Sequence, residues 1–171
     1  MKPISDLIDL LIIELKSLYA VENTELTEMT NFIFKIENDP LKEILQAHND
    51  QTKRQIIRLA KSLSLFGEIP STLESKFIQT YFKETKRTIL NTTELSVIKA
   101  KIILFYQTLS HIEIASYGTL LAYSKKMKME ELSALLETSL KEVKTFDLKL
   151  SLLAEFKINE DALVETFTPI N

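Results

Sequence analysis

Apolar residues recur every three or four positions along most of the chain, a spacing that places them on one face of an α-helix. The pattern predicts helices over residues 4–37, 41–66, 73–89, 94–125 and 130–156. The third of these is the shortest and lies within a long connection between the second and the fourth. No stretch alternates as a strand would, so we expect an all-α fold.

The connections predict how the helices are arranged. Asn38-Asp39-Pro40 links the first two helices, with Asp39 suited to the N-cap and Pro40 to the first turn. Lys125–Lys128 forms a similar short turn between the last two. Helices joined by short links pack antiparallel, and residues 71–91 are long enough to cross the outside of a bundle. We therefore expect a ferritin-like antiparallel four-helix bundle, with a long crossover carrying a short helix, as a single domain over residues 1–171.

Residues at the remaining helix ends also indicate where those helices begin or end. Pro3 or Ser5 suits the start of the first helix, and Thr92 or Thr93 suits the start of the fourth. Gly67 is expected to end the second helix.

Two acidic residues interrupt the apolar faces. Glu22 falls at the centre of the apolar stripe of the first helix, and Glu113 falls at the centre of that of the fourth. A carboxylate in a core is costly unless it is paired, protonated or bound to a ligand. His48, Thr52 and Gln55 lie on the inward face of the second helix, so the predicted core has a polar midpoint.

This midpoint suggests a metal site but lacks most of the usual ligands. Ferritin-like di-metal proteins use one Glu from each of two helices and a Glu-x-x-His pair from each of the other two. Counted from the turns, these pairs should fall at Thr52-x-x-Gln55 and Val143-x-x-Phe146, and neither contains them. Glu25, Glu142 and Asp147 fall at the edges of the stripes.

The sequence therefore leaves two interpretations of the inward carboxylates open. One is a degenerate metal site. The other is a pair of buried acids bridged by water, by Tyr106, by Gln55 or by a shared proton, in which case at least one pKa is raised. His48 suits a satisfied core histidine in either case, whereas His111 points away from the stripe. Leu104 lies on that outer face too, where it is available to the crossover helix or to a second subunit.

Composition narrows the function classes. The net charge of −3, without a basic stripe, disfavours nucleic-acid binding. The chain has no cysteine, which excludes thiol chemistry and disulfides and fits a cytoplasmic location. Two histidines and the lack of a Gly-rich turn argue against a catalytic triad or a phosphate loop. The apolar run Leu7–Ile13 contains Asp9, so we expect mature helix there rather than a signal peptide, and no membrane span.

Four motifs resemble one known family. They are Leu10-x-x-x-Glu-Leu-Lys-x-Leu-Tyr-x-x-Glu22, His48-x-x-x-Thr-x-x-Gln-x-x-x-Leu59, His111-x-Glu-Ile-Ala-x-Tyr-Gly-Thr119, and the segment Glu137–Leu150 with Lys144 and Asp147. Together they are similar to the YciE/YciF-like family, also called DUF892. This resemblance implies a four-helix fold, a homodimer, a link to bacterial stress responses and metal binding.

The match to the family pattern is incomplete at the acidic positions. The matching residues are Glu22, His48, Gln55, Glu113, Glu142 and Asp147. Asp50-Gln51, Ser110 and Val143 depart from it at places where the family usually has acidic residues. Metal binding therefore cannot simply be inherited from the family.

We interpret the sequence as a ferritin-like, stress-associated bacterial protein of unassigned activity, non-enzymatic and with a degenerate metal site. The alternative is a carboxylate-bound di-metal oxidoreductase or peroxide-handling protein that uses iron or manganese. A third class is an interaction module that binds a partner through its dimer surface or crossover. The sequence indicates no required cofactor and no particular substrate. The candidate metal ligands are Glu22, Glu113, Gln55, Glu142, Asp147 and His48.

Overall fold

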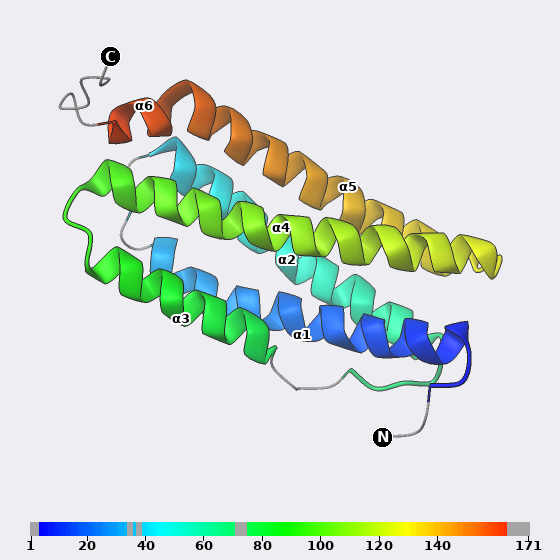
Figure 1. The fold of residues 1–171 in the computed structure, drawn as a ribbon. Coiled ribbons are helices and arrows are strands. Elements are labelled where there is room, and N and C mark those ends of the chain that lie inside the picture. The colour runs from blue at the N-terminus through cyan, green and yellow to red at the C-terminus, as the bar shows by residue number, and fades with distance from the viewer. Residues whose placement is uncertain (1–3, 34–35, 37–38, 71–74, 164–171) are drawn as a thin grey trace, which may run out of the picture.

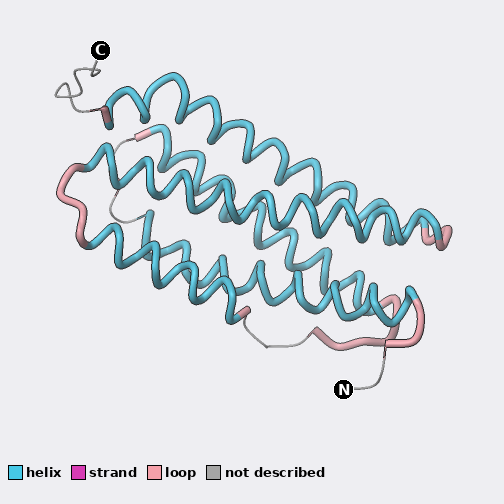
Figure 2. The backbone as a smooth tube through the Cα atoms, in the orientation of Figure 1, coloured by secondary structure: helices cyan, strands magenta, loops and turns pink. Residues whose placement is uncertain are grey.

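The computed structural model is an all-α bundle, and it describes residues 4–33, 36, 39–70 and 75–163 (Figure 1). Within these residues every regular element is helical (Figure 2). The long helices are α1 (Leu7–Ile33), α2 (Pro40–Ser64), α4 (Leu95–Lys126) and α5 (Glu130–Leu153). A shorter helix, α3 (Lys76–Leu90), lies in the connection between α2 and α4. The predicted fold class is confirmed, and the described helix ends agree with the predicted ones to within a few residues.

The four long helices form a closed ring of contacts. Helix α1 packs on α2 and α4, and α5 packs on the same two helices from the other side. The chain reverses direction between α1 and α2 and again between α4 and α5, so each pair is antiparallel (Figure 1). The connection that contains α3 leaves α2 and α4 pointing the same way. This is the arrangement expected of two hairpins joined by one long crossover.

Helix α3 covers one side of the bundle, along α1 and α4. The Tyr81 ring stacks on Phe105 with centroids 5.1 Å apart, and its hydroxyl lies 3.0 Å from Thr108 Oγ1. At the start of α3, the Ser75 backbone N–H donates to Thr24 Oγ1. The crossover is thus held by packing and by hydrogen bonds to both hairpins.

The connection between α1 and α2 confirms the predicted cap. The Asp39 side chain accepts a 2.9 Å hydrogen bond from the Leu41 backbone N–H, and Pro40 occupies the first turn. Asp39 also pairs with Lys99 of α4. After α2, Gly67 adopts φ = +68°, a left-handed conformation that favours glycine. Both ends of α2 are therefore fixed by the residues that the sequence indicated.

The cap predicted for α4 was wrong, and the residue that caps α1 had not been singled out. Helix α1 is capped by Asp6, whose Oδ1 accepts from the Asp9 N–H at 2.8 Å, and Ser5 lies near this start as predicted. Ser5 donates to the Asp9 carboxylate, and Pro3 lies outside the described residues. Helix α4 begins after Glu94, which makes no side-chain capping bond, and not after Thr92 or Thr93. A well-packed helix can begin without a cap because most of its stability comes from burying its apolar face.

The far end of α5 departs from a regular α-helix. A π-helical segment, Ala154–Ile158, follows α5 and leads into the short helix α6 (Asn159–Ala162). Ala154 and Ile158 remain buried against the bundle. The predicted helix end at residue 156 falls inside this segment.

The predicted apolar stripes form the core. Leu11, Leu15, Leu41 and Leu45 are fully buried, as are the following members of the stripes of the other helices: Leu59, Leu63, Ile102, Phe105, Leu109, Leu120, Leu132, Leu136, Val143 and Leu150. Ile4 and Ile8, at the start of the first stripe, are about half exposed instead. In the described part of the chain, no helix is both long and apolar enough to cross a membrane.

Candidate metal centre at the bundle midpoint

Three glutamates meet inside the bundle. Glu22 and Glu25 come from α1 and Glu113 comes from α4, and their exposed fractions are 0%, 2% and 0%. One carboxylate oxygen from each lies within 4.8 Å of the others. We call these three residues the carboxylate cluster. An arrangement this close and this dry can hold a cation, or it must retain protons.

Helix geometry explains how the sequence builds this cluster. Residues three or four apart share a helix face, so Glu22 and Glu25 project together from α1. Glu113 and Tyr117 project together from α4 for the same reason. The antiparallel packing of α1 against α4 brings the two pairs to the same depth.

Two neighbouring side chains contact the cluster. The Tyr117 hydroxyl donates a 2.6 Å hydrogen bond to Glu22 Oε1. His48 Nε2, from α2, lies 2.8 Å from Glu25 Oε1. The His48 ring stacks on Phe146 of α5, with centroids 3.5 Å apart and an interplanar angle of 7°. Tyr117 of α4 therefore orients Glu22, and His48 of α2 orients Glu25.

As ionised groups, four carboxylate oxygens of the cluster have no hydrogen-bond donor among the described residues, whereas a retained proton lets Glu25 and Glu113 hydrogen-bond to each other. The four oxygens are Oε2 of Glu22, Oε2 of Glu25 and both oxygens of Glu113. Buried polar atoms nearly always have a partner, so these carboxyl groups either pair through retained protons or bind a cation. Further buried side chains of the bundle also have polar atoms without a partner there: His48, Thr52, Gln55, Tyr106 and Ser110.

Burial sets the protonation of the cluster. Burial, and next the charge of Glu22, raises the pKa of Glu25 to about 8. Burial raises the pKa of Glu22 and of Glu113 well above the usual range, and the charge of a neighbouring glutamate adds to the effect in each case. Burial lowers the pKa of His48 to about 3. In the absence of a cation, the cluster therefore keeps its protons at neutral pH and His48 is neutral.

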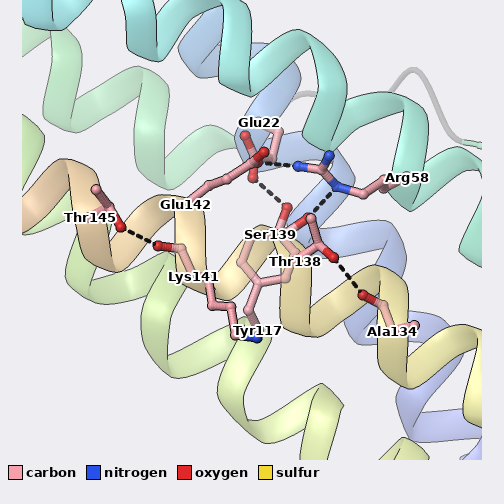
Figure 3. A network of polar contacts seen from close by, with 9 residues as sticks. All are labelled: Glu22, Arg58, Tyr117, Ala134, Thr138, Ser139, Lys141, Glu142 and Thr145. Carbon is pink, nitrogen blue, oxygen red and sulfur yellow. Dashed lines mark hydrogen bonds and ion pairs between the residues drawn. The ribbon is translucent and has the colours of Figure 1, made fainter.

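The structure brings together only some of the predicted site residues. Glu22, Glu113 and His48 lie in or beside the cluster, and Gln55 is fully buried without a partner among the described residues. Glu142 pairs with Arg58, as Figure 3 shows, and stays at the edge of the core. Asp147 also lies at the edge, 3.6 Å from the exposed His111.

Two contributors to the cluster, Glu25 and Tyr117, were misplaced or missed from the sequence. Glu25 was predicted at the edge of its stripe, which was wrong because it is buried. The predicted bridging partners Tyr106 and Gln55 make no hydrogen bond to the cluster, whereas Tyr117 does. The spacing of three between Glu22 and Glu25, and of four between Glu113 and Tyr117, is the signal that could have identified both.

The donor set determines which ion would fit. Three carboxylates from two helices provide hard oxygen ligands, which suit manganese, magnesium or calcium and are also used by iron(II). At the predicted Glu-x-x-His position of α5 stand Val143 and Phe146, both buried and apolar. The described residues therefore fit one divalent cation better than a pair.

Comparison with known proteins gives consistent matches. A family model described as a domain of unknown function, DUF892, matches residues 6–163. Protein YciF of Escherichia coli strain K12 is 28% identical over 155 residues, which cover 90% of this chain and 93% of YciF. The resemblance indicated by the helix motifs is therefore confirmed.

Solved structures agree with the fold. YcfI from Rhodopseudomonas palustris has a TM-score of 0.82 at 29% identity, and the match covers 88% of this chain and 96% of that one. The crystal structure of the E. coli stress protein YciF has a TM-score of 0.81 at 25% identity, covering 92% and 99%. A protein from Xanthomonas campestris pv. campestris, at 21% identity and a TM-score of 0.73, supports the fold alone.

Proposed function

The chain belongs to the DUF892 family of YciF-like proteins, and on this premise we propose that it is a stress-associated bacterial protein whose ferritin-like bundle binds one divalent metal ion. The observation that carries the proposal is the meeting of three buried glutamates at the bundle midpoint, four of whose oxygens lack a donor when they are ionised. These oxygens belong to three glutamates that lie within 4.8 Å of one another.

Each residue around the cluster has a distinct part in this proposal. Glu22, Glu25 and Glu113 would hold the ion. His48 and Tyr117 are positioning residues, because each contacts one oxygen of a glutamate and leaves the other unpartnered. Such outer partners fix the orientation of ligating carboxylates and raise metal affinity. Manganese or iron, as the divalent ion, suits the oxygen ligands.

The role of the ion in this proposal is structural. A cation bound by residues of α1 and α4 would replace protons held by the carboxylate cluster and join the two hairpins of the bundle. Ligands that bind only the folded state stabilise it by mass action. The three glutamates are at most 2% exposed, so little beyond water or another small molecule could reach the ion.

A di-metal oxidoreductase is less well supported. It needs ligands from α5, but Phe146 stacks on His48 and Glu142 is paired with Arg58. We therefore propose structural metal binding in preference to redox catalysis.

A homodimer is part of the same proposal. Leu104, Leu148 and Leu152 are about half exposed on α4 and α5. A shallow groove of about 700 Å³ runs beside Leu104 and is lined also by Gln107, Thr108, His111, Ile112 and Ala115. Apolar surface of this kind suits contact with a second copy, and light scattering of the purified chain tests it.

The test of metal binding is equilibrium dialysis against Mn²⁺ after treatment with a chelator. We expect one ion for each chain in the wild type and none in the E22Q/E113Q variant. E131Q is the matched control, because Glu131 is an exposed carboxylate that pairs with Lys61. Binding that is absent from the wild type, or that survives in E22Q/E113Q, would overturn the proposal.

A further inference from the structure

A polar contact between α2 and α5 lies next to the carboxylate cluster. Arg58 of α2 donates through Nη2 to Glu142 Oε2 and through Nε to Ser139 Oγ, the latter at 2.9 Å. Ser139 is fully buried, and the side chains of Arg58 and Glu142 are 16% and 21% exposed. The guanidinium is therefore held by two partners on α5 and is mostly shielded from solvent.

The contact between Arg58 and Glu142 lies beside Glu22 of the carboxylate cluster. Figure 3 shows the Glu22 and Glu142 carboxylates directed toward the same region beside the Arg58 guanidinium. The charges of Arg58 and Glu142 both lie close enough to Glu22 to act on its carboxyl group. Oε2 of Glu22 has no hydrogen-bond partner among the described residues.

We propose that the Arg58 guanidinium takes the place of a second metal ion and so limits the bundle to one ion. When the positive charge of Arg58 is removed, a second metal ion would bind between Glu22 and Glu142. The inference rests on the proposed function, because it concerns how many ions the same midpoint holds. It assigns Arg58 a role that determines metal stoichiometry.

The chemistry of the guanidinium supports this role. Arginine stays protonated in proteins, and its planar fork binds carboxylates and hydroxyls in a fixed geometry. While Arg58 is in place, Glu142 Oε2 is paired and the guanidinium offsets the negative charge that an ion would need there. A divalent cation brought next to Arg58 would also be repelled at short range in a poorly solvated site. Removal of Arg58 eliminates the repulsion and frees Glu142.

A nearby ion pair provides the matched comparison. Lys61 and Glu131 also join α2 to α5, with a distance of 2.8 Å between Nζ and Oε1. Their side chains are 56% and 55% exposed, so solvent screens this pair. A change in metal stoichiometry that comes from the buried contact should not appear when this exposed pair is broken.

The experiment is a titration with Mn²⁺ of the chelator-treated full chain, followed by equilibrium dialysis and electron paramagnetic resonance. We expect one equivalent in the wild type, in K61Q and in R58K, which keeps the charge. We expect two equivalents in R58Q, with the broadened signal of two neighbouring manganese ions. R58Q/E142Q should return to one equivalent, because the freed carboxylate is then absent.

A second variant keeps the proposal testable if R58Q does not fold. In E142Q the guanidinium loses its carboxylate partner and its charge acts more fully on Glu22. The affinity for the first Mn²⁺ should then fall by roughly tenfold relative to the wild type. Affinity that is unchanged in E142Q would contradict the proposal.

The outcomes separate this inference from the proposed function. A wild type that binds no ion overturns the metal site itself. A wild type and an R58Q variant that both bind one ion leave the metal site in place and overturn the role of Arg58. Two equivalents in R58K would also overturn it, because the charge is retained there.

Discussion

His48 Nε2 lies 2.8 Å from Glu25 Oε1, and this contact joins α2 to α1 at the midpoint of the bundle. Both side chains are only 1–2% exposed. Burial raises the pKa of Glu25 to about 8 and lowers that of His48 to about 3, so a neutral carboxyl and a neutral imidazole share one hydrogen bond at pH 7. The pair avoids buried charge and still fixes the orientation of Glu25.

The first prediction concerns the stability of the metal-free protein as a function of pH. Glu25 has a pKa of about 8 in the folded state against 4.5 as a free side chain, so the folded state binds more protons between these values. Stability that is present at acidic pH is therefore lost as the pH rises toward 8. His48 acts in the opposite direction, but only between about pH 3 and 6.5.

Above pH 6.5 the carboxyl groups alone decide the sign. Glu25 by itself should lower the free energy of unfolding by about 2 kcal/mol between pH 6.5 and 8.5. Glu22 and Glu113 act in the same direction, because their pKa values are also raised. Urea denaturation in the presence of a chelator measures this, and E25Q should flatten the slope. Stability that is constant or rises over this interval would contradict the assigned protonation.

The second prediction concerns protons released by a metal. A cation binds ionised carboxylates, and the cluster holds protons at neutral pH, so Mn²⁺ binding should release them. Calorimetric titrations at pH 7 in two buffers with different ionisation enthalpies give the number of protons released for each ion bound. We expect at least one proton for each ion and an affinity that increases with pH. Binding that is independent of both buffer and pH would place the ion elsewhere.

The third prediction compares two buried tyrosines on α4. Tyr117 donates to Glu22 at 2.6 Å, whereas the Tyr106 hydroxyl has no partner among the described residues. Y117F leaves a buried carboxyl without its donor and should cost about 1–3 kcal/mol in the free energy of unfolding. Y106F removes only an unpaired hydroxyl and should be close to neutral. Equal losses in the two variants would mean that the hydrogen bond to Glu22 contributes little.

The fourth prediction concerns the start of α2. Asp39 caps this helix through the Leu41 N–H and pairs with Lys99 of α4. D39N keeps the cap and loses the ion pair, while D39A loses both. Because Asn caps helices about as well as Asp, D39A should be less stable than D39N by about 1 kcal/mol. Thermal unfolding of the two variants measures this difference, and the prediction fails if they melt together.

The fold could be predicted from the sequence because its signals are local and repeated. Every long helix has many apolar stripe residues, so the predicted fold does not depend on any one of them. Ile8, for example, was predicted to be buried and is about half exposed. Asp39, Pro40 and Gly67 marked both ends of α2 because their backbone chemistry is specific. Asp6 and Glu94 could not be chosen over their neighbours, since several polar residues there were equally suitable.

The site could be predicted only in part, because it depends on how the helices are offset along their axes. Counting from the turn placed Gln55 level with Glu22, whereas the structure pairs His48 with Glu25. The difference is about one helical turn, and helix ends are uncertain by that much when read from a sequence. The same offset determines that Arg58 reaches Ser139 and Glu142, which no single-helix pattern could indicate.

The most direct test of the central claim is a crystal of the wild-type chain soaked in Mn²⁺, with anomalous diffraction measured near the manganese edge. We expect one anomalous peak in each chain, bounded by the carboxylates of Glu22, Glu25 and Glu113 and absent from E22Q/E113Q. A midpoint without a peak would contradict the metal site. Two peaks in the wild-type chain would contradict the assignment of a single ion.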